Sequence, residues 1–119
     1  MTGFLNGIAT AMVTPFTVDG VNFAELERMI EYQLAGGSDA LVILGTTGEP
    51  ATMTEDEKEK VIRFALDKAK GRIKIIVGTG SNDTKKAVAA SVRAEKAGAD
   101  GVLAVTPYYN KCTQRGLFE

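Results

Sequence analysis

Two threonines in a glycine-flanked turn are the first residues whose types and spacing suit chemistry. They stand in the stretch Gly45-Thr46-Thr47-Gly48-Glu49, directly after an apolar run. Glycine lets the main chain approach a ligand closely, and backbone N–H groups with two hydroxyls can hold a carboxylate or phosphate oxygen. The alternative is an ordinary turn in which Thr46 and Thr47 only satisfy nearby backbone groups. The stretch is not a Walker loop, because the lysine and the spacing of that motif are missing.

Two adjacent tyrosines form the second candidate. They lie in the polar stretch Thr106-Pro107-Tyr108-Tyr109-Asn110-Lys111, again after an apolar run. Most tyrosines at the end of a strand are packing residues with a solvated hydroxyl. A phenol near Thr46 could instead pass a proton through hydroxyl-to-hydroxyl bonds. Both interpretations stay open at this point.

Lysine is the residue type that forms Schiff bases with carbonyl substrates, and two lysines are candidates for that role. Lys111 lies in a polar loop beside Asn110, where little desolvation is available to activate an amine, so a solvated surface residue is expected. Lys74 alternates with Ile73 and Ile75, which indicates a strand edge or a side chain that extends to water. Neither lysine is expected to be a nucleophile.

The composition excludes several classes of function. The chain has no histidine, which excludes histidine acid–base catalysis and argues against a catalytic zinc site. Its net charge of −1 gives no electrostatic case for nucleic acid or an acidic membrane surface. No apolar run reaches the ~18 residues that span a bilayer, and residues 1–5 lack the pattern of a signal peptide. The one cysteine, Cys112, fits a reducing compartment, so a cytoplasmic location is expected.

The elements that must position these residues alternate between short apolar runs and amphipathic segments. Strands are predicted at residues 8–13, 40–44, 73–77 and 101–105. Helices are predicted at residues 23–34, from the N-cap Thr54 with its capping-box partner Glu57 to near Gly71, and from Asp83 or Asn82 to residue 97. In the second helix, Asp56 and Lys60 are spaced to attract each other. Residues 114–119 are expected to begin a fourth helix.

This alternation predicts an α/β fold with a parallel sheet, because the strands are apolar on both faces. Two architectures remain open: an open, flavodoxin-like doubly wound sheet, or the N-terminal half of a (β/α)8 TIM barrel with about four parallel strands and three complete helices. In either fold the polar loops project from one rim, at the carboxyl ends of the strands. Residues 1–119 are expected to be a single unit that is cut off in the first turn of its fourth helix. As a half barrel it would have two open edges and an exposed apolar interior.

Several stretches together resemble the dihydrodipicolinate synthases. They are Gly7-Ile8-Ala9-Thr10-Ala11-Met12-Val13-Thr14-Pro15-Phe16, Leu44-Gly45-Thr46-Thr47-Gly48-Glu49, Val77-Gly78-Thr79-Gly80-Ser81-Asn82, and Ala97-Gly98-Ala99-Asp100-Gly101 running into the tyrosine stretch. The first stretch is shared, with variation, by other pyruvate-dependent aldolases such as N-acetylneuraminate lyase. The threonine pair combined with the tyrosine stretch is more specific to the synthases.

The resemblance implies a lyase of lysine biosynthesis, in the diaminopimelate pathway, that works without a cofactor or metal. In that family pyruvate forms a Schiff base with a barrel lysine and condenses with aspartate semialdehyde. Thr46 would join a proton relay and Thr47 would help bind the pyruvate carboxylate. Tyr109 would cross a tight-dimer interface to complete the neighbouring relay, within a homotetramer that is a dimer of dimers. Tyr108 would stack at that interface, and Asn82 and Ala51 would line an adjoining inhibitor cleft.

The chain also departs from that family. The last four strands of the barrel are not in this sequence, nor is the Schiff-base lysine, so residues 1–119 are expected to be inactive alone. Cys112 stands where the family usually has proline. Lys58 and Lys86 stand where lysine-sensitive members tend to carry histidine and glutamate, which predicts weak inhibition by lysine or none.

Two functions from other classes remain open. One is a flavodoxin-like binding module that is complete at 119 residues. The other is a non-catalytic half barrel that uses Tyr108 and Tyr109 in an interface.

Overall fold

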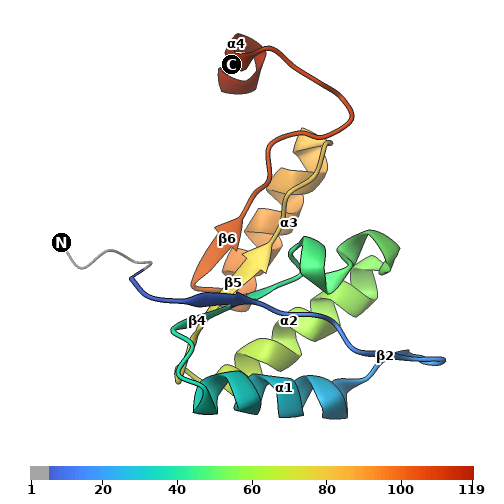
Figure 1. Cartoon of the computed structure of the whole chain (residues 1–119). Helices are drawn as coiled ribbons and strands as arrows, with labels where there is room; N and C mark the ends of the chain where they lie inside the picture. Colours follow the sequence, from blue (N-terminus) through green and yellow to red (C-terminus); the bar gives the residue numbers. More distant parts are fainter. Residues whose placement is uncertain (1–5) are drawn as a thin grey trace.

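The computed structural model describes residues 6–119 and contains one parallel four-stranded sheet (Figure 1). The strands are β1 (Ala9–Ala11), β4 (Ala40–Ile43), β5 (Lys74–Gly78) and β6 (Gly101–Leu103). They lie in the order β1-β4-β5-β6, and every neighbouring pair is parallel. The prediction of four parallel strands is confirmed. Residues 1–5, which lack a signal-peptide pattern, lie outside the described residues.

Three helices connect these strands and pack beside the sheet (Figure 1). They are α1 (Phe23–Ala35), α2 (Glu55–Ala69) and α3 (Thr84–Ala97). A short fourth helix, α4 (Gln114–Phe118), stands away from the body of the molecule at the end of an extended segment (Figure 1). The prediction of three complete helices and the start of a fourth is confirmed.

The order of the strands decides between the two predicted architectures. A doubly wound sheet reverses its strand order at a switch point, so that helices cover both faces. Here the strands follow one another in chain order without a reversal. Right-handed crossovers in a constant direction place all connecting helices on one side, as in a barrel. The flavodoxin-like alternative is therefore wrong.

The helix ends follow from local side-chain chemistry. The Thr54 hydroxyl accepts a hydrogen bond from the Glu57 N–H at 3.2 Å, and the Glu57 carboxylate accepts one from the Thr54 N–H at 2.8 Å, so the predicted capping box is present. Asp83, rather than Asn82, caps α3 by accepting from the N–H groups of its first turn. Gly98 ends α3 in the left-handed region, with φ of 97°.

The core lies between the sheet and the three helices. Sheet residues that face the helices are fully buried, as are the helix residues that pack on them. The largest are Leu26, Ile30, Leu41, Ile43, Val61, Ile75 and Val77. Burial of such side chains contributes about 1.5–3 kcal/mol each, which makes this layer the main source of stability.

The opposite face of the sheet is open. It carries a shallow hollow of about 220 Å³ whose lining includes Val42, Ile76 and Leu103. Within residues 6–119 the outer edges of β1 and β6 pair with no other strand, and apolar side chains beside them, such as Ile8 and Val105, are exposed. The expectation of two open edges and an exposed apolar interior is confirmed.

Some elements differ from the predicted ones. A small antiparallel hairpin, β2 (Phe16–Thr17) with β3 (Gly20–Val21), follows the first strand and was not predicted, because two residues a side carry no readable alternation. Two single turns of 3-10 helix, η1 (Thr46–Gly48) and η2 (Pro50–Thr52), lie between β4 and α2. Most of the strands are shorter than the apolar runs that predicted them.

Of the two interpretations of Lys74, the strand edge is wrong, whereas an exposed side chain is present. Lys74 begins β5, which is an interior strand between β4 and β6. Its side chain is exposed because it lies on the open face of the sheet, beside the hollow, where no helix covers it.

Among the helices of residues 6–119, none combines the length and apolar character that crossing a bilayer requires.

Candidate functional site

Four loops meet at the rim formed by the carboxyl ends of the parallel strands. They are residues 12–15 after β1, 44–54 after β4, 79–83 after β5 and 104–113 after β6. Because all the strands are parallel, these loops leave the sheet at the same end. The predicted common rim for the threonine and tyrosine stretches is therefore present.

The loop after β4 presents Thr46 and Thr47 to solvent. Gly45 is extended, and Thr46–Gly48 make one 3-10 turn closed by the hydrogen bond from the Gly48 N–H to the Gly45 oxygen at 2.8 Å. Both threonines are exposed, and within residues 6–119 neither hydroxyl bonds to another group of the chain. The alternative in which these hydroxyls only satisfy nearby backbone groups is wrong. Two free hydroxyl donors on one turn suit an anionic oxygen ligand.

The same loop is held by a neighbour on the loop after β1 and by the end of β5. The buried Thr14 hydroxyl, after β1, donates to the Gly48 carbonyl oxygen at 2.8 Å. Leu44 is buried with a left-handed backbone, at φ of 55°, which is uncommon for a residue of its size. Its carbonyl oxygen passes over Gly78 at the end of β5, in the space that a Cβ there would fill.

These contacts were missed from the sequence. Thr14 was expected on the rim as part of the loop Thr14-Pro15-Phe16, and Gly78 only as part of a matching stretch, with no individual role for either. A polar residue directly after an apolar strand and a glycine as the last residue of the next strand were the available signals. Neither of these two signals shows which loop the residue contacts.

The tyrosine loop after β6 stands farther out. The two rings of Tyr108 and Tyr109 meet edge to face, with centroids 6.2 Å apart. Tyr109 has a left-handed backbone, at φ of 61°, and its side chain is 92% exposed. Within residues 6–119 no hydrogen bond joins its hydroxyl to Thr46, so a relay between them stays a prediction. Asn82, after β5, donates to the Asn110 side chain at 3.3 Å and ties the two loops together.

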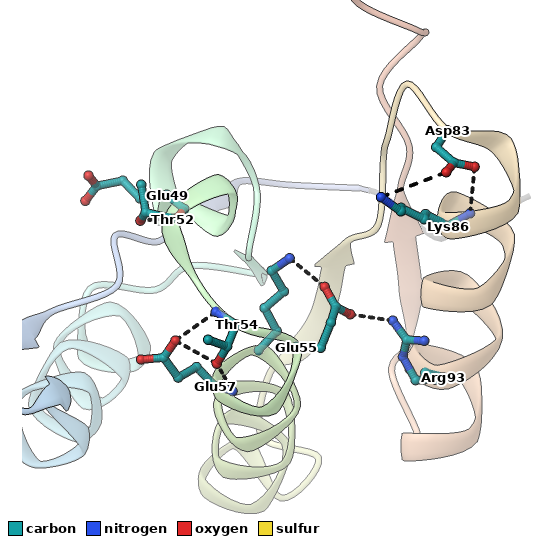
Figure 2. Close-up of polar contacts among 9 residues, drawn as sticks. Glu49, Thr52, Thr54, Glu55, Glu57, Asp83, Lys86 and Arg93 are labelled. Carbon is teal, nitrogen blue, oxygen red and sulfur yellow. Dashed lines mark hydrogen bonds and ion pairs between the residues drawn. The ribbon is translucent and has the colours of Figure 1, made fainter.

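A group of charged side chains lies between the first turn of α2 and the facing side of α3 (Figure 2). The Glu55 carboxylate accepts from Lys58 at 2.8 Å and from Arg93 of α3 at 2.7 Å. The hydrogen bond from Lys58 lowers the pKa of the Glu55 carboxyl, and the charges of Arg93 and Lys86 add to this. Lys86 lies 3.9 Å from Asp83 and is largely exposed. Three cationic groups, Lys58, Lys86 and Arg93, therefore gather around the Glu55 and Asp83 carboxylates.

Ala51 and Asn82 were predicted to line an inhibitor cleft with Tyr108. Ala51 is exposed in η2, and Asn82 lies in the loop that joins β5 to α3. Asn82 reaches the tyrosine loop through Asn110, whereas no hydrogen bond within residues 6–119 links Ala51 to that loop. The cleft stays a prediction.

The remaining reactive side chains do not form a site within residues 6–119. Lys111 and Cys112 are exposed in the tyrosine loop. Lys74 lies at the amino end of β5, away from the loop rim. In the described part of the chain, no three histidine, cysteine, aspartate or glutamate side chains gather as a metal site requires.

A parallel sheet in chain order, with polar loops gathered at the carboxyl ends of its strands, is the arrangement of part of a (β/α)8 barrel. Within this fold class, the sequence model of the Dihydrodipicolinate synthetase family matches residues 4–119, and the chain belongs to this family. The sheet and helices match the N-terminal part of the barrel of these synthases.

Three relatives show how close this likeness is. The 4-hydroxy-tetrahydrodipicolinate synthase 1 of Clostridium acetobutylicum is 52% identical over 95% of this chain and 39% of its own length. The dihydrodipicolinate synthase structure from Thermotoga maritima has a TM-score of 0.94 at 48% identity, over 98% of this chain and 39% of that chain. The chloride-inhibited synthase from Acinetobacter baumannii, solved with pyruvate, has a TM-score of 0.91 at 43% identity, over 94% and 39%. The chain thus spans about 39% of the length of these relatives.

Proposed function

We propose that this chain forms the substrate-loop part of a 4-hydroxy-tetrahydrodipicolinate synthase. Such an enzyme condenses pyruvate, held as a Schiff base, with L-aspartate-4-semialdehyde in lysine biosynthesis through diaminopimelate. The observation that carries the proposal is the pair of exposed, unpartnered hydroxyls of Thr46 and Thr47 on the rim loop, within residues 6–119. The pyruvate in a related synthase structure supports the choice of ligand.

In this proposal the two hydroxyls have different tasks. Thr47 donates to the pyruvate carboxylate, because a neutral hydroxyl bonds an anionic oxygen without adding charge to the pocket. Thr46 is a member of the proton relay that serves the condensation. No cofactor or metal takes part, since the Schiff base itself withdraws electrons from the pyruvate carbons.

Tyr109 is proposed to complete the relay of a second copy, across the tight interface of a homotetramer built as a dimer of dimers. Its side chain is 92% exposed and its backbone is left-handed, which suits a contact in trans. Tyr108 would stack at that interface, with Asn82 and Ala51 beside it in the inhibitor cleft. We further propose that the enzyme is cytoplasmic.

The Schiff-base lysine is proposed to lie outside these residues, in the remainder of one barrel domain to which residues 1–119 contribute βα units 1–3, strand 4 and the start of helix 4. Lys111 is exposed in a polar loop, and Lys74 lies at the end of the sheet opposite the loops. Residues 1–119 alone would then be inactive.

A chimera tests the proposal. Residues 1–119 replace the matching segment of the Clostridium acetobutylicum synthase, which supplies the rest of the barrel. The chimera should condense pyruvate with aspartate semialdehyde, and Thr47→Val should raise the KM for pyruvate about 10- to 100-fold, as expected for a lost hydrogen bond to a charged group.

The activity of the chimera also tests two alternative functions. Cleavage of N-acetylneuraminate without condensation would assign the chain to another pyruvate-dependent aldolase. A folded chimera with neither activity would favour a non-catalytic interaction module and contradict the proposal. Circular dichroism and the assembly state of the chimera serve as folding controls.

A further inference from the structure

The loop that carries Thr46 and Thr47 is held from outside by a threonine on another loop. Thr14 lies after β1, and its side chain is 6% exposed. Its hydroxyl donates to the carbonyl oxygen of Gly48, the residue directly after Thr47, at 2.8 Å. This bond joins two rim loops whose residues are 34 positions apart.

Besides forming a hydrogen bond, the two loops pack closely at this contact. A Cβ on Gly48 would lie 3.2 Å from the Thr14 hydroxyl oxygen and 3.3 Å from the Met12 carbonyl oxygen. The main chain of the substrate loop therefore lies directly against the β1 loop. A small movement of Thr14 would move Gly48 with it.

The exposed threonines depend on this support. Within residues 6–119 their hydroxyls have no partner, so their direction is set by the backbone turn on which they stand. That turn is closed by two backbone bonds, from the Gly48 N–H to the Gly45 oxygen and from the Glu49 N–H to the Thr46 oxygen. The third support is the bond from Thr14.

We propose that Thr14 is a positioning residue, which holds the Gly45–Gly48 turn so that the Thr47 hydroxyl meets the pyruvate carboxylate and the Thr46 hydroxyl keeps its place in the relay. The inference rests on the proposed function for its substrate. Whether Thr14 holds the loop does not depend on the identity of the substrate, and it can be measured separately.

Three variants separate a positioning role from a purely structural one. Thr14→Val keeps the shape of the side chain and removes the hydroxyl, whereas Thr14→Ser keeps the hydroxyl. Thr79→Val is the matched control, because Thr79 is 4% exposed and its hydroxyl accepts from the Ser91 hydroxyl of α3 at 2.9 Å, with no hydrogen bond to the substrate loop within residues 6–119. Each valine variant thus loses one buried, hydrogen-bonded hydroxyl, but only Thr14→Val loses a bond to the substrate loop.

The first measurement is hydrogen exchange by mass spectrometry on the chimera with the Clostridium acetobutylicum synthase. Thr14→Val should speed exchange in the peptide that covers residues 44–53 and leave β4 and β5 unchanged. Thr14→Ser and Thr79→Val should exchange in that peptide as the unmodified chimera does. Unchanged exchange in Thr14→Val would overturn the proposal.

The second measurement uses steady-state kinetics of the same chimera. Thr14→Val should raise the KM for pyruvate roughly 10- to 100-fold, as expected when binding groups are misplaced by a fraction of an ångström. The KM for aspartate semialdehyde should stay unchanged, and Thr14→Ser should restore the pyruvate value. A structural role alone would lower the active fraction, and so kcat, at constant KM; that result would overturn the proposal.

The two measurements allow a failure of the proposed positioning role to be told apart from a failure of the proposed function. If the unmodified chimera does not react with pyruvate, the proposed function fails. Hydrogen exchange then still decides whether Thr14 holds the loop. If exchange responds to Thr14→Val but the KM for pyruvate does not, the function stands and the positioning role is wrong.

Discussion

The carbonyl oxygen of Leu44 lies over Gly78, in the space that a side-chain carbon at position 78 would occupy. Leu44 turns there into the substrate loop with a left-handed backbone, at φ of 55°. The end of β5 therefore has a shape that accepts this turn, and glycine is the residue that leaves the room.

We expect Gly78→Ala to destabilise the chain by about 1–3 kcal/mol, because the added methyl group overlaps backbone atoms that cannot rotate away. Gly45→Ala is the control, since a Cβ there meets only Val42 at 3.5 Å. That variant should be neutral, or stabilising by up to about 1 kcal/mol, through the lower entropy of its unfolded chain. Urea denaturation of both variants measures the two values, and equal values would contradict the overlap.

Two aspartates at the opposite end of the sheet form a matched pair. Asp39, before β4, accepts from the Ile8 N–H at 2.7 Å, and Asp100, before β6, accepts from the Ile75 N–H at 2.8 Å. Ile75 is fully buried, whereas Ile8 is 68% exposed. Asp100→Ala should cost about 1–3 kcal/mol, because a buried N–H loses its partner, and Asp39→Ala should cost less because water replaces the carboxylate. Denaturation midpoints that rank the two variants the other way would contradict this.

The capping box of α2 should make the stability of the fold depend on pH in the acidic range. The Thr54 backbone N–H lowers the pKa of the Glu57 carboxyl, and the Thr54 hydroxyl adds to this. A carboxyl whose pKa is lowered on folding stabilises the fold above its ordinary pKa of about 4.3, and this is lost as pH falls through the lower, folded value. Glu57→Gln should thus unfold at lower urea than the unmodified chain at neutral pH, and the difference should shrink below about pH 4.

Controls for the capping box come from the same chain. Thr54→Ala should cost about 1 kcal/mol at neutral pH through the lost cap. Glu95→Gln, on the exposed surface of α3, removes a carboxyl outside the box. If Glu95→Gln shows the same pH dependence as Glu57→Gln, the box is not its source.

The proposed synthase should respond weakly to lysine or not at all. Lys58 is held by Glu55 at 2.8 Å, while Lys86 and Arg93 add positive charge beside it (Figure 2). Cationic groups repel the ammonium groups of lysine. The condensation rate of the chimera should stay constant as lysine is added, and a Lys58→His, Lys86→Glu double variant should gain sensitivity. Inhibition of the unmodified chimera by sub-millimolar lysine would contradict the prediction.

Local patterns were enough to predict the helices and the four strands of the parallel sheet. The capping box of Thr54 and Glu57 lies within four consecutive residues, and the predicted ion pair between Asp56 and Lys60 is present at 2.6 Å. The choice between a barrel and a doubly wound sheet could not be made from these patterns, because it depends on which side each crossover packs. The hairpin of Phe16–Thr17 with Gly20–Val21 was too short to show a pattern.

The candidate site was predicted only in part, for a similar reason. Thr46 and Thr47 stood out by residue type, and parallel strands were enough to place them on the rim. The support from Thr14 and the space at Gly78 arise between segments far apart in the chain, where no local period relates the partners. Glu55 likewise meets Arg93 across 38 positions, which spacing along α2 alone does not reveal.

Trapping with borohydride tests the central claim most directly. The chimera and the 119-residue chain are each incubated with pyruvate, reduced, and measured as intact mass, followed by peptide mapping. We predict one reduced pyruvate adduct per chimera subunit, on a lysine outside residues 1–119, and none on the isolated chain. An adduct on Lys111 or Lys74, or a folded chimera that forms no adduct, would contradict the account.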